Sequence, residues 1–165
     1  MRGADAMDAV DKILKDPRYV RYIGSNAETE KDRIFCRHDL QHAFDVARVA
    51  YIMDLERDLR IKKEKIYIAA LLHDIAKWKQ YGDGTDHALE GSALAADILK
   101  DAGVSREDAE EIMDAIRTHR EKDLKRSSLG AVLYESDKAC RLCCSCRSID
   151  GCRRFADGRI PETEY

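Results

Sequence analysis

Proline is nearly absent from this chain, which has two prolines and nine glycines in 165 residues. So few helix breakers leave long stretches free to form helices, and no segment shows the sustained polar–apolar alternation of a strand. Aromatic residues make up 7% of the chain. No apolar run reaches the roughly 18 residues that a transmembrane helix needs. The sequence therefore predicts a single all-α domain with no membrane span.

Neither sign of charge dominates, because the formal net charge is only -3. This balance gives no pull toward nucleic acid or an anionic membrane, so neither is expected as a partner. The chain is 44% hydrophobic and 37% charged, which is typical of a folded domain rather than a disordered one. The stretch Met1–Asp5 has no apolar core of a signal peptide, so we expect a cytoplasmic protein.

One apolar segment delivers two polar residues to the interior. Ile66–Leu72 is apolar almost all round, which predicts a buried helix within residues 62–77, and His73 and Asp74 follow it directly. A buried carboxylate beside an imidazole needs compensation, and a metal cation is the strongest available. Further ligands are therefore expected on other helices.

Four more polar side chains end apolar helical stripes: His42, His87, His119 and Asp137. Each could alone be a hydrogen-bonded core residue. Taken together with the histidine–aspartate pair, they favour one or two metal ions, because the ions satisfy all of these side chains at once. Imidazole and carboxylate ligands suit iron, manganese, cobalt, nickel or zinc better than calcium.

The periodicity and capping residues predict a series of helices. Their expected ranges are 4–15, 17–23, 27–35, 39–59, 62–77, 86–102, 106–119 and a last helix that begins after Ser127 or Ser128 and reaches about residue 140. Gly24-Ser25-Asn26 is expected to break the chain, and residues 80–85 are expected to form a loop.

The motifs resemble the H…HD…D signature of the HD-domain metal-dependent phosphohydrolases. The matching strings are His42-Ala43-Phe44-Asp45-Val46-Ala47, Leu71-Leu72-His73-Asp74-Ile75-Ala76-Lys77 and Asp137-Lys138. The resemblance implies an HD-domain helical bundle over residues 36–141, with helices of residues 1–35 packed on it and a tail over 142–165. It also implies that His42, His73, Asp74 and Asp137 hold one ion.

His87 and His119 look like the extra ligands of subgroups with two metals. These subgroups include a bacterial diadenosine tetraphosphatase group and the HD-GYP cyclic dinucleotide phosphodiesterases, although the GYP signature segments are absent here. The resemblance implies a phosphohydrolase that cleaves a phosphate ester or anhydride of a nucleotide, or of a related small phosphorylated metabolite, with a metal-activated hydroxide. The alternative is a non-catalytic HD module that senses a nucleotide or a metal and carries a redox- or metal-responsive cysteine tail.

Catalytic and substrate-binding roles follow from position. Asp74 is expected to bridge two metals, and Lys77 either steadies a phosphate or is a solvated lysine at a helix end. His38, Arg120 and Arg141 are candidate substrate contacts. His38 could instead support a ligand residue, or could equally be a surface histidine, and a surface arginine is the default reading for Arg120 and for Arg141.

Five of the six cysteines crowd into the C-terminal segment. The spacing Cys140-x2-Cys143-x2-Cys146-x5-Cys152 is typical of a thiolate metal site, with Cys144 as the alternative to Cys140. We expect a structural zinc or an iron–sulfur cluster there. Two other readings stay open: reduced, reactive thiols in a loose tail, and a core thiol at Cys140.

Overall fold

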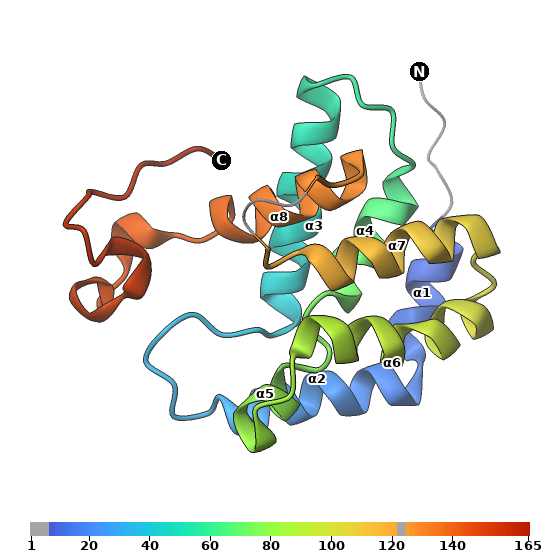
Figure 1. The fold of residues 1–165 in the computed structure, drawn as a ribbon, viewed down its shortest axis with the longest axis horizontal. Helices are drawn as coiled ribbons and strands as arrows, with labels where there is room; N and C mark the ends of the chain where they lie inside the picture. Colours follow the sequence, from blue (N-terminus) through green and yellow to red (C-terminus); the bar gives the residue numbers. More distant parts are fainter. Residues whose placement is uncertain (1–6, 122–124) are drawn as a thin grey trace.

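The computed structural model describes residues 7–121 and 125–165, and it contains helices and no strand within those ranges, which confirms the all-α class (Figure 1). The helices are α1 (Asp8–Lys15), α2 (Pro17–Thr29), α3 (Leu40–Glu56), α4 (Lys63–Leu72), α5 (Lys77–Asp83), α6 (His87–Ala102), α7 (Arg106–Thr118) and α8 (Ser128–Ala139). Short 3-10 turns follow at Cys143–Ser145, Ile149–Gly151 and Arg153–Phe155.

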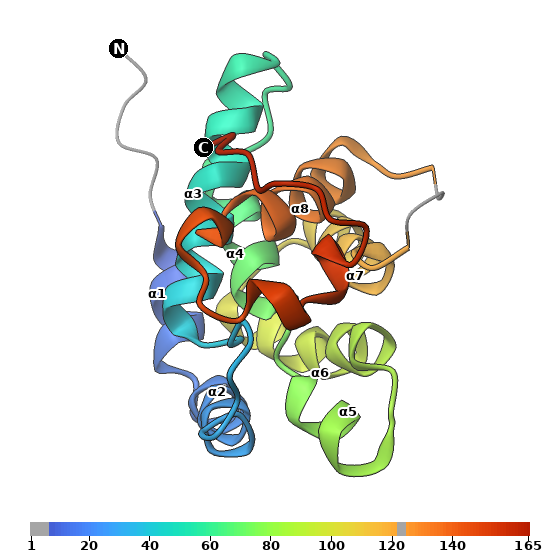
Figure 2. The ribbon, with the colours of Figure 1, turned by 90° about the vertical axis from the view of Figure 1, so that its left-hand side faces the viewer.

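Helix α4 forms the centre of the bundle. It packs against α1, α3, α6, α7 and α8, and its side chains from Ile66 to Leu72 are almost all buried (Figures 1 and 2). Burying a side chain such as Leu72 contributes about 2 kcal/mol. A helix that is apolar on every side is stable where other helices cover all of its sides. Helix α4 occupies such a place, so the predicted burial of this helix is confirmed.

The N-terminal helices belong to the same core as the rest of the bundle. Ile13 of α1 and Tyr19 of α2 lie in the main hydrophobic cluster. Residues beyond α8 leave the bundle and fold as a separate lobe, drawn in red in Figure 1. Within the described ranges, no helix combines the length and the apolar character that crossing a membrane requires.

Local capping sets several helix ends where the sequence predicted them. The side chains of Asp39, Asp86, Ser105 and Ser127 accept hydrogen bonds from backbone N–H groups at the starts of α3, α6, α7 and α8. Gly103 ends α6 with φ at 83°, in the left-handed region that a side chain disfavours.

The predicted break at Gly24-Ser25-Asn26 is wrong, because α2 runs through it to Thr29. A glycine in a helix costs only about 1 kcal/mol relative to alanine. The completely buried Asn26 makes three hydrogen bonds to distant parts of the chain, which offset that cost. The helix predicted over 27–35 is also wrong: α2 ends at Thr29, and the carboxylate of the next residue, Glu30, accepts a hydrogen bond from His38 N at 2.7 Å and so folds the following loop back.

The helix predicted over 62–77 ends earlier, at Leu72, and residues 73–76 form a turn before α5 begins at Lys77. Residues 80–83, predicted as loop, therefore belong to α5. Helix α3 likewise stops at Glu56, short of residue 59, because Asp58 adopts a positive φ and the Asp54 carboxylate accepts from Ile61 N. Residues 4–6 of the first predicted helix lie outside the described residues.

Candidate metal centre

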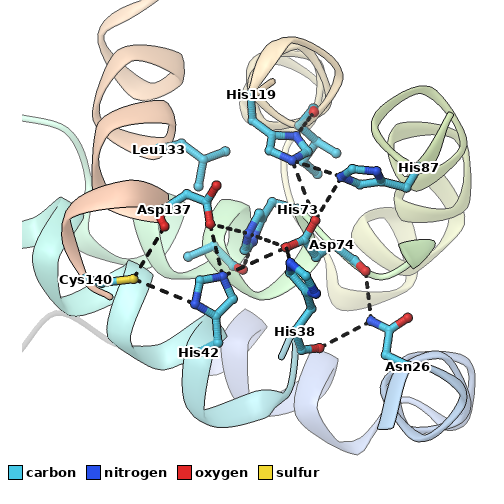
Figure 3. Close-up of polar contacts among 12 residues, drawn as sticks. Asn26, His38, His42, His73, Asp74, His87, His119, Leu133, Asp137 and Cys140 are labelled. Carbon is cyan, nitrogen blue, oxygen red and sulfur yellow. Dashed lines mark hydrogen bonds and ion pairs between the residues drawn. The ribbon is translucent and has the colours of Figure 1, made fainter. Parts of the chain in front are cut away.

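Four predicted ligands from three helices and a turn converge in the centre of the bundle. His42 lies in the first turn of α3, His73 caps the end of α4, Asp74 lies in the turn that follows, and Asp137 lies near the end of α8 (Figure 3). His42 Nε2 is 3.1 Å from Asp137 Oδ1, and His73 Nε2 is 2.9 Å from Asp74 Oδ2. Each residue offers a ligand atom within 4.8 Å of the others, so one ion could contact all four.

A second group shares Asp74 with the first. Asp74 Oδ1 is 3.0 Å from His87 Nε2 and 3.6 Å from His119 Nε2, and these two nitrogens are 3.3 Å apart. The two oxygens of Asp74 therefore face different ligand groups, Oδ2 toward the first and Oδ1 toward the second (Figure 3). This geometry suits a carboxylate that bridges two metal ions.

Three of the histidine rings are held by a contact on the side away from the centre. His73 Nδ1 lies 2.7 Å from Ala70 O, and His119 Nδ1 lies 2.6 Å from Ile116 O. His87 Nδ1 lies 2.6 Å from Gln80 Oε1. A carbonyl oxygen at Nδ1 keeps the proton on that nitrogen and turns the lone pair of Nε2 toward the centre, as in protein metal sites.

The donor set fits divalent cations. His73 Nε2 is buried and has no hydrogen-bond partner in the described part of the chain, although carboxylate oxygens lie near it. Burial lowers the pKa of both His42 and His87, which favours the neutral, ligating ring. Burial acts against ionisation of Asp74, but His73 outweighs it and holds the pKa of that carboxyl well below its usual range. Neutral imidazoles around ionised carboxylates are what such a cation requires.

Binding of a divalent cation is expected to displace a proton from this centre at neutral pH. Burial alone would lower the pKa of His73, but Asp74 and Asp137 outweigh burial and raise it to about 10. Metal-free His73 is therefore protonated at pH 7, whereas a ligating nitrogen must be free of its proton. The apparent affinity should rise about tenfold per pH unit between roughly pH 6 and pH 9.

Isothermal titration calorimetry in buffers of different ionisation enthalpy counts this proton. Lys100, an exposed lysine of α6, provides a control: Lys100→Met should leave the count unchanged. Binding with no proton release and no pH dependence would contradict the assignment of His73 as a ligand.

The predicted substrate contacts differ in where they lie. Arg141 reaches the first ligand group, with Nη2 2.9 Å from His42 Nε2 and 3.6 Å from Asp137 Oδ1. His38 Nε2 lies 4.0 Å from Asp74 Oδ2, and Lys77 lines the same cavity as His38.

Arg120, also predicted as a substrate contact, instead pairs with Asp86 at 3.3 Å near the surface. Asp86 caps the start of α6, so this arginine has a local structural partner.

Asn26 and Glu30 support the centre and were not predicted. The Asn26 amide donates to Asp74 O at 2.9 Å (Figure 3). It also accepts from Trp78 N at 2.8 Å, so it holds the turn between α4 and α5. Glu30 pairs with His38 Nδ1; burial opposes its ionisation, but His38 holds the pKa of this carboxyl at about 2. No sequence signal marks these residues, because their partners lie in other segments of the chain.

The predicted cysteine ligand group Cys140, Cys143, Cys146 and Cys152 does not come together as a four-ligand cluster. Among the described residues, no cysteine belongs to a group of three ligand atoms within 4.8 Å of one another. Cys140 lies against the first ligand ring instead, with Sγ 3.7 Å from His42 Nδ1. Burial raises the pKa of this thiol to about 12, so it stays protonated, as the core-thiol reading holds.

Comparison with known proteins agrees with this geometry. Residues 39–143 match the HD domain family. An uncharacterized protein of Clostridium beijerinckii is 42% identical over 146 residues, which cover 88% of this chain and 92% of that protein. Ribonuclease Y of Lawsonia intracellularis is 32% identical over 123 residues, which cover 73% of this chain but only 21% of the ribonuclease.

The crystal structure of a predicted HD superfamily hydrolase from an uncultured Thermotogales bacterium has a similar fold. It superposes with a TM-score of 0.58 at 28% identity, over 79% of this chain and 72% of that one. The family match covers every residue of both ligand groups, from His42 to Asp137. The chain therefore belongs to the HD domain family of metal-dependent phosphohydrolases.

Proposed function

We propose that this protein hydrolyses a phosphate ester or anhydride of a nucleotide, or of a related small phosphorylated metabolite. The observation that carries the proposal is the pair of ligand groups that share Asp74, beside a cavity of about 510 Å³ to which His38 and Lys77 contribute. Cavities of this volume are in the range that binds small molecules.

The lining of this cavity supports a substrate with both phosphate and an aromatic ring. Its cationic side chains are Arg33, Lys77, Arg153 and Arg154, and its aromatic ones are Phe35 and Tyr81. Arginine and lysine bind phosphate oxygens, whereas aromatic faces stack on a base. This combination favours a nucleotide over an unsubstituted small phosphate.

Residues of this chain orient the reacting groups. When bound, two divalent cations activate water and neutralise charge on the phosphate. His38, whose Nδ1 is paired with Glu30, presents Nε2 to Asp74 and the cavity, where the doubly protonated ring donates a hydrogen bond to a phosphate oxygen. Burial lowers the pKa of Lys77, and the nearby Asp74 carboxylate opposes this shift by favouring the cation, the form in which Lys77 binds phosphate.

Replacing Lys77 with methionine is expected to keep the metal content and to lower kcat/KM on the order of 10²-fold, as the loss of one charge-stabilising donor typically does. Lys77 lines the cavity but belongs to neither ligand group, so only substrate handling should suffer. The matched control is Lys100→Met on the exposed side of α6. Equal activity of the two variants would contradict the phosphate-binding role.

A panel of phosphate compounds tests the function itself. The protein is reconstituted in turn with iron, manganese, cobalt, nickel and zinc, and is offered mononucleotides, dinucleoside polyphosphates and sugar phosphates. A short oligoribonucleotide joins the panel because ribonuclease Y is a relative over part of its length. Turnover of a small nucleotide supports the proposal. Nucleotide binding without turnover of any compound would favour the sensing module. Cleavage of the oligoribonucleotide alone would contradict the proposed small substrate and would identify RNA as the substrate.

A further inference from the structure

The C-terminal lobe is docked on the loop between α2 and α3. Ser148 Oγ donates to Ile34 O at 2.9 Å, and Arg141 Nη1 donates to Arg37 O at 3.0 Å. A Cβ atom at Gly151 would lie 3.5 Å from the Phe35 ring, so the backbone and the ring are in close contact. Two segments more than 100 residues apart in the chain thus form one surface beside the bundle (Figure 2).

Four cysteines line one cavity between these segments. The cavity has a volume of about 280 Å³, and Cys36 from the loop meets Cys143, Cys146 and Cys152 from the lobe there. All four are half-buried. The remaining two cysteines are placed otherwise: Cys144 is exposed, and Cys140 contacts His42.

The backbone around these cysteines is turned tightly. Cys146 N donates to Cys143 O at 3.2 Å, and Cys152 N donates to Ile149 O at 2.9 Å. The first of these turns spans Cys143-x2-Cys146, a spacing that is typical of zinc-binding loops, and the second leads into Cys152.

We propose that Cys36, Cys143, Cys146 and Cys152 are the four ligands of a zinc ion that joins the loop to the lobe. This set replaces the one expected from spacing, because Cys36 takes the place of Cys140. Tetrahedral zinc with Zn–S bonds of about 2.3 Å holds sulfurs about 3.8 Å apart. Among the described residues no three sulfurs lie within 4.8 Å of one another, so the proposal requires the loop and the lobe to move closer together when zinc binds.

This ion would also shape the substrate cavity, a consequence that rests on the proposed function. Cys36 and Cys152 line both the substrate cavity and the cavity of the four cysteines. Arg153 and Arg154 follow directly after Cys152 and line the substrate cavity. A fixed Cys152 therefore fixes two of the four cationic side chains that would contact phosphate.

Cobalt substitution tests the ligand set without any assay of turnover. Full-length protein is purified reduced and without oxygen, and zinc is replaced by Co²⁺. Thiolate ligands give cobalt charge-transfer bands that histidine and carboxylate ligands do not, so the bands report on the cysteine site alone. We expect these bands in the wild type and in Cys144→Ser. In Cys36→Ser we expect the bands to disappear and the zinc content to fall by about one ion per chain.

Alkylation mapped by mass spectrometry gives a second readout that needs no variant to fold. Zinc should protect Cys36, Cys143, Cys146 and Cys152 from iodoacetamide and leave Cys144 reactive. Unchanged bands in Cys36→Ser, or zinc-independent alkylation of the four thiols, would overturn the proposal. Iron with acid-labile sulfide in the anaerobic protein would overturn the zinc assignment in favour of a cluster.

Discussion

Replacing Asp74 with alanine is expected to remove both metal ions and all measurable turnover. Its two carboxylate oxygens face the two ligand groups separately, at 2.9 Å from His73 Nε2 and 3.0 Å from His87 Nε2. Without it the first group loses one of its four ligands, and the second keeps only His87 and His119. The loss in kcat/KM should exceed the roughly 10²–10³-fold that a single charge-stabilising donor supplies.

Asp137→Ala is the matched comparison for this prediction, because Asp137 belongs to the first group only. Elemental analysis, with the zinc of the proposed cysteine site counted separately, should find no ion at the two ligand groups in Asp74→Ala and up to one ion per chain there in Asp137→Ala. An exposed aspartate on α6 serves as the surface control, so Asp97→Ala should match the wild type in metal and activity. If Asp74→Ala held as much metal as Asp137→Ala, Asp74 would not be a bridge.

Replacing Asn26 with alanine is expected to cost about 4 kcal/mol of the free energy of unfolding. The change leaves the Asp74 carbonyl and the Trp78 N–H inside the protein without their partner, and an unsatisfied buried group costs roughly 1–3 kcal/mol. In a chain of this length, that loss lowers Tm by roughly 10 °C. Because the turn that carries Asp74 is released, metal affinity should also fall about 10- to 100-fold.

The neighbouring Ser25→Ala provides the control for Asn26→Ala. Ser25 is exposed and donates only to Arg21 O within its own helix, so its removal should shift Tm by no more than about 1–2 °C. Thermal unfolding of the metal-free proteins separates the stability effect from metal binding. A similar Tm for both variants would show that Asn26 does not hold the turn.

The candidate ligands are among the features that could be predicted from the sequence. His42, His73, Asp74, His87, His119 and Asp137 were predicted because each ends an apolar helical stripe, and a buried ionisable side chain at such a place is costly unless something pairs with it. The structure brings them together in two groups that share Asp74, and within each group the ligand atoms lie within 4.8 Å of one another. The starts of α3, α6, α7 and α8 were likewise predictable, because a capping side chain bonds to a backbone N–H only two or three residues away.

Features that depend on distant partners were decided by the tertiary structure. Gly24-Ser25-Asn26 has a local preference for a break, and contacts about 50 residues away outweigh it. The helix predicted through Lys77 ends at Leu72 for a related reason. The Asp74 carbonyl lies beyond the end of that helix and accepts a hydrogen bond from the Asn26 side chain instead.

The cysteines show the same division between local spacing and long-range packing. Spacing identified a cluster in the tail but selected Cys140, which packs on His42. Only the docked lobe brings Cys36 to the cavity with Cys143, Cys146 and Cys152. The sequence alone thus determined the fold class, the central helix and the six inward candidate ligands, because helical periodicity and burial are local properties. Which turn holds Asp74, and which thiols share a cavity, depended on segments that meet only in the folded chain.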